Sequence, residues 1–244
     1  MESFLTGLHR EPDILALSET RMEANHPPVS LPGYSEVHSF TKERKPGGVA
    51  LLIKESLRYR QLAQYYLNFS RCEQIWISLN QPLANFPNII IGAIYRHPKP
   101  SEDAKFIEEL QNTLSQITKD GKKCIILGDI NIDLASTNRK SAELQNMLKT
   151  NAISSIITQP TRCNWKTQTL IDHIYTNIST NPINPYVVQE TVSDHFPVAA
   201  ELIAAKPKGP RSDIKKKQPI LDTDSEEIYT KAVAFFCKAT HSHP

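Results

Sequence analysis

Short apolar segments recur along the chain, and most are bounded by Gly, Pro, Asn or charged residues. They are rich in Ile, Val, Leu or Tyr, and they cover residues 13–17, 49–53, 75–79, 89–94, 124–127, 171–175, 186–188 and 196–203. Segments of this length, composition and punctuation predict β-strands. Several are apolar throughout rather than alternating, so we expect strands that are buried on both faces.

Two other segments have the period of an amphipathic helix. The apolar residues between 106 and 117 fall on one helical face, Ser101 can cap this helix, and Gly121 can end it. A second helix is expected at about residues 141–149. Many strands with few intervening helices predict an α/β protein in which two sheets pack face to face with helices outside.

The composition changes at Lys206. Residues 206–217 hold six basic residues and one acid, with two prolines and a glycine. This composition indicates one domain over residues 1–205, then a basic linker or arm over 206–219. The composition supports a solvated segment with no partner about as well as it supports a basic arm that binds one. Residues 220–244 are expected to form a tail with one amphipathic helix at most.

Bulk properties limit the function classes. A formal charge of +2 over 244 residues gives no strong general attraction for polyanions, so nucleic-acid affinity would need local basic patches. Four widely spaced cysteines without a C-x-x-C pair argue against a zinc site or a disulfide framework. The N-terminal residues lack the apolar segment of a signal peptide, and no apolar run is long enough to cross a membrane. We expect a soluble intracellular protein, nuclear or cytoplasmic, with no membrane partner.

Residues capable of catalysis lie at or near the ends of five apolar segments. In chain order they are Glu19, Tyr95, Asp129 with Asn131, Asp172, and Asp194 with His195. Residues two apart on a strand face the same side, so Asp129 and Asn131 are expected to project together. Gly-Asp-Ile-Asn would also suit an ordinary turn after a strand. An acid inside a strand is costly unless paired, so Asp172 either faces solvent or has a partner such as a histidine.

Taken together, these segments resemble the endonuclease/exonuclease/phosphatase superfamily. They are most similar to the apurinic-endonuclease-like domain of non-LTR retrotransposons of the jockey and chicken-repeat kind. The resemblance is carried by PDILALSET, GGVALLIK, GAIYRHP, ILGDIN, TQPTR with TLIDHIYTN, and SDHFPV, which span residues 12–204. TLIDHIYTN followed by SDHFPV is its most specific part, whereas GDIN departs from the commoner GDFN in one apolar residue.

The resemblance implies a four-layer α/β sandwich and a metal-dependent active site. Glu19 matches the principal metal ligand of the family, and Asp194 matches an acid that approaches the same metal. Mg²⁺ suits such a site because it prefers carboxylate oxygens and keeps several waters, and Mn²⁺ could replace it.

The resemblance also implies a catalytic role for five residues. Asp129 would orient and deprotonate the attacking water, and Asn131 would hold that water or the phosphate. Asp172 would accept a hydrogen bond from His195, which favours an imidazolium facing the phosphoryl oxygen. Tyr95 would contact the scissile phosphate or support the leaving group.

The implied function is a DNA-nicking endonuclease, which hydrolyses a phosphodiester of double-stranded DNA and leaves a 3′-hydroxyl that primes reverse transcription. Arg96 and His97, and the loop residues Lys42, Arg44 and Lys45, are candidate phosphate contacts. For the three loop residues, a solvated surface loop explains the sequence as well as a phosphate contact does. The reverse-transcriptase region of full-length relatives is absent from this sequence.

One part of the family pattern is missing. The family's domain normally opens with a strand bearing an Asn that reaches the active site, and this chain begins at what resembles the following helix. We expect an open sheet edge there, which costs stability. A truncated or decayed copy, at best a nucleic-acid-binding module, is therefore one alternative. A phosphatase of the superfamily acting on other phosphoesters is another, although TLIDHIYTN argues against it.

Overall fold

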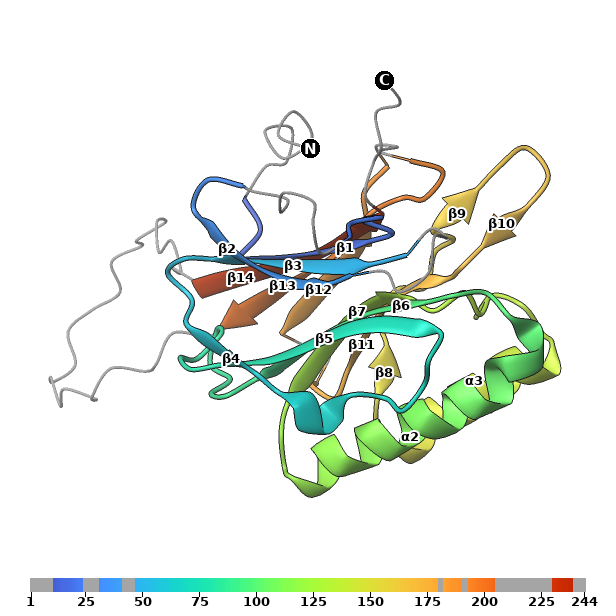
Figure 1. Cartoon of the computed structure of the whole chain (residues 1–244), viewed down its shortest axis with the longest axis horizontal. Helices are drawn as coiled ribbons and strands as arrows, with labels where there is room; N and C mark the ends of the chain where they lie inside the picture. Colours follow the sequence, from blue (N-terminus) through green and yellow to red (C-terminus); the bar gives the residue numbers. More distant parts are fainter. Residues whose placement is uncertain are drawn as a thin grey trace, which may run out of the picture.

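Two six-stranded β-sheets lie face to face, and the helices cover the outer side of one of them (Figure 1). The computed structural model describes residues 11–23, 31–40, 47–179, 182–189, 193–204 and 230–238. Between the sheets, apolar side chains from both form one continuous core. The α/β sandwich expected from the strand pattern is confirmed.

Sheet A has the strand order β12-β13-β14-β1-β3-β2. Its strands are β12 (Ile183–Val187), β13 (Val198–Ala204), β14 (Thr230–Lys238), β1 (Ile14–Ser18), β3 (Val49–Lys54) and β2 (Tyr34–Ser39). Successive side chains of β1 alternate between the two faces of the sheet: Ile14 and Ala16 join the core between the sheets, and Leu15 and Leu17 join a smaller cluster on the other face. This strand is therefore buried on both faces, as its uninterrupted apolar sequence predicts.

Sheet B has the order β4-β5-β6-β7-β11-β8. Its strands are β4 (Tyr59–Gln61), β5 (Cys72–Leu79), β6 (Ile90–Arg96), β7 (Cys124–Asp129), β11 (Asp172–Thr176) and β8 (Ser154–Ser155), and a short 3₁₀ helix, η1 (Ala63–Tyr65), follows β4. Strands β6 and β7 are parallel, and the other neighbouring pairs are antiparallel. A separate hairpin of β9 (Arg162–Cys163) and β10 (Gln168–Thr169) projects from the sandwich (Figure 1).

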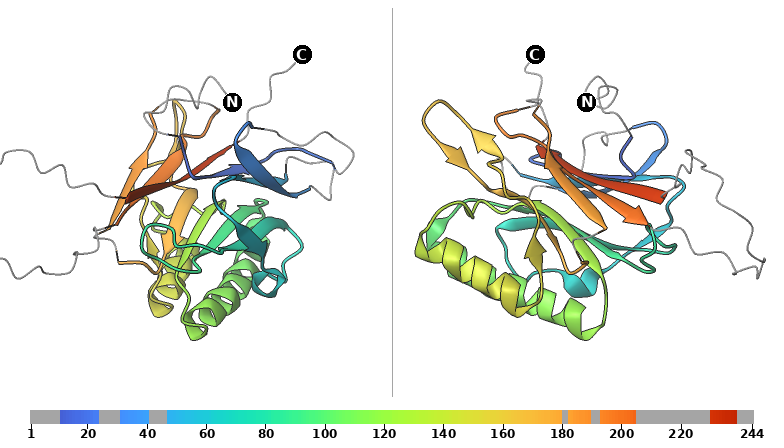
Figure 2. Two further views of the ribbon diagram at one scale, coloured as in Figure 1. Left: turned by 90° about the vertical axis from the view of Figure 1, so that its left-hand side faces the viewer. Right: turned by 180° about the vertical axis from the view of Figure 1, so that it is seen from behind.

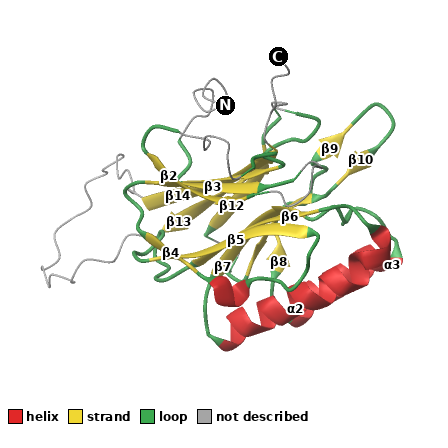
Figure 3. Cartoon of the chain, viewed as in Figure 1, coloured by secondary structure: helices red, strands yellow, loops and turns green. Residues whose placement is uncertain are grey.

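Helices α2 (Asp103–Lys119) and α3 (Arg139–Thr150) lie on the outer face of sheet B (Figure 3). The apolar face predicted for α2 is confirmed, and Phe106, Leu110, Leu114 and Ile117 are completely buried against the sheet. In the described ranges, no helix covers the outer face of sheet A. No helix there has the length and apolar character needed to cross a membrane.

The helix starts differ from the sequence expectation. Ser101 does not cap α2, because Pro100–Glu102 form a 3₁₀ turn, η2, and the N-cap residue Glu102 makes no side-chain capping hydrogen bond. Helix α3 begins two residues earlier than predicted, because the side-chain oxygen of Asn138 accepts a hydrogen bond from the backbone N–H of Ser141 at 2.9 Å.

Strand β14 lies near the centre of sheet A, between β13 and β1 (Figure 2). It is parallel to β1, with Ile14 opposite Ala234, and antiparallel to β13, with Val198 opposite Phe236. The helix expected within residues 220–244 is therefore wrong over Thr230–Lys238. The open edge expected beside β1 is also wrong, because β1 pairs on both sides. The linker predicted at 206–219 lies outside the described residues.

Removing β14 should destabilise the protein, because β1 and β13 would each lose one ladder of backbone hydrogen bonds. We expect a chain that ends at residue 229 to unfold on the order of 10 °C lower than the full chain, and to aggregate more readily. A chain that ends at Lys238 is the matched control. Equal unfolding temperatures for the two shortened chains in a thermal scan would contradict the stabilising role of β14.

A buried histidine makes the stability of the fold dependent on pH. His173 is completely buried and stacks on Tyr175 with ring centroids 5.2 Å apart. Burial lowers its pKa from the ordinary value of 6.5 to about 4, so the ring is neutral in the folded protein at pH 7. Between these two pH values the unfolded chain binds a proton that the folded chain does not, and stability falls as the pH falls.

The change His173→Gln removes this titration. We expect the wild-type chain to lose about 3 kcal/mol more of its free energy of unfolding than this variant when the pH falls from 7 to 4. Urea unfolding at a series of pH values measures the difference. Equal acid sensitivity of the two proteins would show that His173 is not the titrating group.

Candidate active site

Three polar side chains form a row across the inner face of sheet B. Tyr95 on β6 lies opposite Asp129 at the end of β7, and Asp129 lies opposite Asp172 at the start of β11. Partners in register project from the same face of a sheet, so these side chains are neighbours. All three are buried, with 1% of Asp129 and 1% of Asp172 exposed. Residues that are far apart in the sequence therefore meet at one end of the sandwich.

A glycine before Asp129 allows β7 to approach β6 closely. A Cβ atom on Gly128 would lie 2.5 Å from the carbonyl oxygen of Ile94, a distance that side chains do not tolerate. Any larger residue would push β7 away from β6 and displace Asp129 from the row. The glycine of the Gly-Asp pair is thus required by the packing of the strands.

Sheet A contributes Glu19 to the same end of the sandwich. Glu19 follows β1, has a positive φ of 51°, and accepts a hydrogen bond from the hydroxyl of Tyr95 at 3.2 Å. The next residue, Thr20, donates its backbone N–H to the carbonyl of Gly48, whose φ of 90° suits glycine. This contact with the start of β3 fixes the loop that carries Glu19.

Sheet A also supplies His195, just before β13. Its Nδ1 lies 2.9 and 3.0 Å from the two carboxylate oxygens of Asp172. An ionised carboxylate can only accept, so Nδ1 donates and the orientation of the ring is set. Both side chains are almost fully buried, at 4% and 1% exposure. The acid inside the predicted strand thus has a histidine as its partner.

The segments that carry Asp172 and His195 are joined by Thr161, which the sequence analysis did not single out. Its hydroxyl accepts from the backbone N–H groups of Ile171 and Asp172 at 3.2 and 3.1 Å. Its carbonyl accepts from Phe196 at 2.6 Å. Thr161 is completely buried and acts as a positioning residue for the histidine–carboxylate pair. Its position in TQPTR was the available signal.

Burial and charge repulsion set the electrostatics of the row. Burial first, and then the negative charge of Asp172, raise the pKa of Asp129 well above its usual range, whereas His195 opposes this shift. Burial and the charge of Glu19 also raise the pKa of the Tyr95 hydroxyl, which therefore stays protonated. Two adjacent buried carboxylates are unfavourable without a compensating positive charge.

The donor set fits a divalent cation. Ligand atoms of Asp129, Asp172 and His195 lie within 4.8 Å of one another, and the charge of Glu19 raises the pKa of Asp129. Nδ1 of His195 donates to Asp172, so the acids rather than this nitrogen would attract a cation. Carboxylate oxygens are the ligands that hard divalent cations prefer. A cation here would offset the repulsion between the buried acids.

Asp194, expected as a second metal ligand, has another partner in this structure. Its carboxylate oxygen Oδ2 lies 2.8 Å from Nη2 and 3.0 Å from Nε of Arg162, and 3.9 Å from Nε2 of His195. Its side chain is 49% exposed. The geometry places it next to the site, and its role as a metal ligand stays a prediction.

A cavity of about 530 Å³ opens over the row. It is lined by Glu19, Arg21, Arg71, Tyr95, His97, Pro98, Asp129, Asn131, Arg162 and His195. Most of the predicted catalytic residues and His97 are therefore together. The three arginines were missed: Arg21 and Arg71 are isolated residues outside the strands, and Arg162, at the end of TQPTR and the start of β9, was not singled out within that motif.

Asn131 reaches the cavity by a different route from the one expected. Strand β7 ends at Asp129, and Asn131 has a positive φ of 52°. Its backbone N–H donates to Oδ1 of Asp129 at 3.0 Å, and its side-chain amide donates to the carbonyl of Arg96 at 2.8 Å. The chain turn, rather than the two-residue period of a strand, brings the amide beside the carboxylate.

Arg96 does not make the phosphate contact predicted for it, because its side chain is completely buried. Its guanidinium forms an ion pair with Asp103 and donates to the carbonyl of Ile130 at 3.0 Å. It also lies 5.2 Å from the centre of the Phe106 ring. Arg96 thus joins β6 to α2 and to the loop after β7. Lys42, Arg44 and Lys45 lie outside the described residues.

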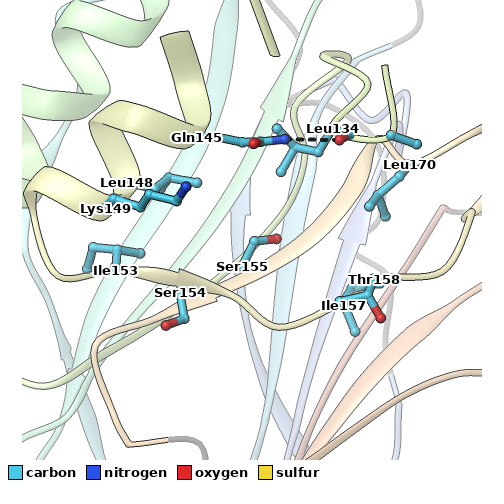
Figure 4. Close-up of a pocket in the computed structure, with 11 residues that line it drawn as sticks. Leu134, Gln145, Leu148, Lys149, Ile153, Ser154, Ser155, Ile157, Thr158 and Leu170 are labelled. Carbon is cyan, nitrogen blue, oxygen red and sulfur yellow. Dashed lines mark hydrogen bonds between the residues drawn. The ribbon is translucent and has the colours of Figure 1, made fainter. Parts of the chain in front are cut away.

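A second cavity, of about 440 Å³, lies between α3 and the segment of β8 (Figure 4). Leu134, Leu148, Ile153 and Leu170 supply most of its apolar surface. Lys149 is the one ionisable residue among its described lining residues, so the carboxylates and imidazole needed for hydrolysis are found at the first cavity.

A model of the Endonuclease/Exonuclease/phosphatase family matches residues 4–195 of the chain. The chain belongs to this family. The match covers the strands that carry Glu19, Tyr95, Asp129 and Asp172, and it ends at His195. The family resemblance noted in the sequence is therefore confirmed. No curated protein matches the chain.

Solved structures of this family share the fold at low identity. The endonuclease domain of TRAS1, a telomere-specific non-LTR retrotransposon, is 14% identical with a TM-score of 0.52, covering 68% of this chain and 78% of that one. A 3′-5′ exonuclease from Neisseria meningitidis is 17% identical with a TM-score of 0.59, covering 82% and 93%. The Xenopus laevis APE2 catalytic domain is 16% identical with a TM-score of 0.53, covering 76% and 82%.

The structural role of Arg96 can be tested by stability. Arg96→Ala would leave Asp103 buried without its partner, so we expect a loss of about 3–5 kcal/mol in the free energy of unfolding. Arg139→Ala, which removes an 88% exposed guanidinium from α3, should change it by less than about 1 kcal/mol. Urea unfolding compares the two. A stable Arg96→Ala variant would return Arg96 to the candidates for DNA contact.

Proposed function

We propose that this protein is a divalent-metal-dependent endonuclease that nicks double-stranded DNA and leaves a 3′-hydroxyl. The observation that carries the proposal is the meeting of Glu19, Tyr95, Asp129, Asn131 and His195 around one cavity. Phosphodiester hydrolysis requires an activated water, donors for the phosphoryl oxygens and support for the leaving oxygen. These residues can supply each requirement.

Asp129 is the proposed general base. Burial raises its pKa, which makes its carboxylate a stronger proton acceptor than an exposed one. The N–H of Asn131 holds its Oδ1 at 3.0 Å, so the direction of the carboxylate is fixed. The attacking water would lose its proton to Asp129, and the Asn131 amide would contact that water or the phosphate.

His195 is the proposed donor to the phosphoryl oxygen. Its Nδ1 is held by Asp172, so a proton offered to the substrate comes from Nε2. Asp172 also stabilises the positive charge of the imidazolium. A donor that is oriented before the reaction stabilises the charge that develops in the transition state. Tyr95, protonated and hydrogen-bonded to Glu19, would contact the phosphate or support the leaving group.

The metal, Mg²⁺ or Mn²⁺, would be held by Glu19, whose carboxylate is oriented by Tyr95. When bound, such a cation supplies Lewis-acid stabilisation of the phosphoryl oxygens. Asp194 would join it only after leaving Arg162, to which it is paired at 2.8 Å.

Double-stranded DNA as the substrate is supported by similarity and by the surface around the cavity. Relatives of the same fold include a retrotransposon endonuclease domain and a Neisseria 3′ phosphatase solved with a product DNA hairpin, the latter 18% identical with a TM-score of 0.51. Arginines line the cavity, and the β9–β10 hairpin exposes Trp165 (87%) with Lys166 over its ring. Basic and aromatic side chains are suited to nucleic-acid backbones and bases.

The test is the nicking of supercoiled plasmid. We expect the wild-type chain to convert it to open circles in Mg²⁺ and to stop when the metal is chelated. Asp129→Asn and His195→Ala should each lower the rate by on the order of 10²–10³-fold, because each removes one preorganised group. Glu108→Gln, on the exposed face of α2, is the matched control and should retain full activity.

Two results would contradict the proposal. Equal nicking by the wild type and both site variants would point to a contaminating nuclease. A folded wild-type chain that binds plasmid without nicking it would favour the interpretation of a decayed copy that retains only binding.

A further inference from the structure

Arg71 and His97 form a fixed pair at the β5 end of the cavity. Arg71 immediately precedes β5, and His97 immediately follows β6. The backbone N–H of His97 donates to the carbonyl of Arg71 at 3.0 Å, continuing the ladder between the two strands. Both residues line the cavity that contains Asp129.

His97 is oriented by a buried carboxylate, as His195 is. Its Nε2 lies 3.0 and 2.9 Å from the two oxygens of Glu73, and its ring meets the ring of Tyr95 edge-on at 5.0 Å. Glu73 on β5 lies opposite Tyr95, so it extends the row formed with Asp129 and Asp172. At each end of this row, an acid holds a histidine that lines the cavity.

Arg71 has hydrogen-bonding capacity that the described protein does not use. Its Nε is buried and has no hydrogen-bond partner in the part of the chain that the structure describes. Of the other cavity arginines, Arg162 directs two N–H groups to Asp194, and Arg21 is exposed. Buried donors without an acceptor are uncommon in folded proteins. The Nε atom itself is enclosed by protein, but the Arg71 side chain lines the cavity, so an anionic ligand bound there would meet its positive charge.

The spacing of the strands shows what kind of anion fits. From β5 to β11 there are three strand-to-strand steps, or about 14 Å at about 4.8 Å each. Nucleotides in one strand of a duplex rise about 3.4 Å each, so this span exceeds a single nucleotide. Basic residues lie at both ends of the span, Arg71 with His97 at one and Arg162 at the other. A single phosphate at Asp129 cannot engage both ends.

We propose that Arg71 and His97 bind a backbone phosphate that neighbours the scissile phosphate, on the β5 side of the site. The substrate strand then runs across the ends of β5, β6, β7 and β11. This inference rests on the proposed phosphodiester hydrolysis and narrows its substrate to a polynucleotide. Glu73 acts as a positioning residue, which fixes His97 beside Arg71.

Binding measurements test the contact without requiring turnover. Arg71→Ala and the charge-matched Arg139→Ala are compared in an Asp129→Asn background, with a fluorescent 20-base-pair DNA duplex in Mg²⁺. We expect Arg71→Ala to weaken binding on the order of 10-fold and to make the slope of log affinity against log salt concentration less negative by about 1. Arg139→Ala, on α3, should change neither. Equal slopes for the two variants would overturn the proposal.

Cleavage measurements show which phosphate Arg71 contacts. Bis(4-nitrophenyl) phosphate has a scissile diester and no neighbouring phosphate, so Arg71→Ala should lose on the order of 10-fold more of its rate on a DNA duplex than on this small substrate. On a DNA duplex, a neutral methylphosphonate is placed at the first phosphate on either side of the mapped nick, one side at a time. At one of these two positions it should slow the wild type on the order of 10-fold. It should not slow Arg71→Ala further, because the contact is already lost.

The outcomes separate this inference from the proposed function. An equal loss of activity by Arg71→Ala on both substrates, or independent effects of the substitution and the methylphosphonate, would overturn the neighbouring-phosphate contact. A wild-type chain that cleaves neither substrate would contradict the proposed hydrolysis, and the salt slopes would still decide whether Arg71 meets a phosphate.

Discussion

The repulsion between Asp129 and Asp172 is the interaction on which the site depends. Both carboxylates are buried and opposite each other in the β7–β11 ladder, and the charge of Asp172 disfavours the charged form of Asp129. His195 offsets part of this repulsion from one side, and a cation beside Glu19 could offset more from the other. Water would weaken the repulsion but would also weaken every directed interaction with a substrate. Positive charge therefore stabilises the buried carboxylates, and an imidazolium or a bound cation could supply it.

The row is complete only because two sheets meet at the same end of the sandwich. Sheet B provides Asp129 and Asp172, whereas Glu19 follows β1 and His195 precedes β13 in sheet A. Strands β1 and β13 are not neighbours, because β14 lies between them. The strands next to Glu19 and His195 are thus held apart by a strand from the C-terminal part of the chain. Strand β14, which contributes no site residue in the described range, therefore affects how far apart the sheet A residues of the site lie.

Much of the fold follows from the sequence, because uninterrupted apolar segments with turn residues at their ends have few other solutions. The residues of the candidate site could be found for the same reason, since most of them lie at or near the ends of those segments. Strand β2 was missed because its polar sequence, YSEVHS, is only partly buried. A helix was predicted over β14 because a short apolar run fits both the helical and the strand period. In the folded protein, the edges of β1 and β13 favour a strand between them. Arg96 was misassigned because its partner, Asp103, lies in the next helix, and only the folded chain shows that the pair is buried.

The distribution of charge around the cavity favours an extended anion over a compact one. The acids Glu73, Asp129 and Asp172 lie along the row, where a polyanion would be repelled until a cation is bound. Basic residues surround it: Arg71 with His97 lies beside β5, Arg162 lies beside His195, and Arg21 follows Glu19. A small phosphomonoester would meet mainly the central acids and would gain little from either end. Under the proposed function, a polynucleotide strand would place its scissile phosphate at the central acids and neighbouring phosphates at the ends, so part of its binding energy would come from groups that do not react.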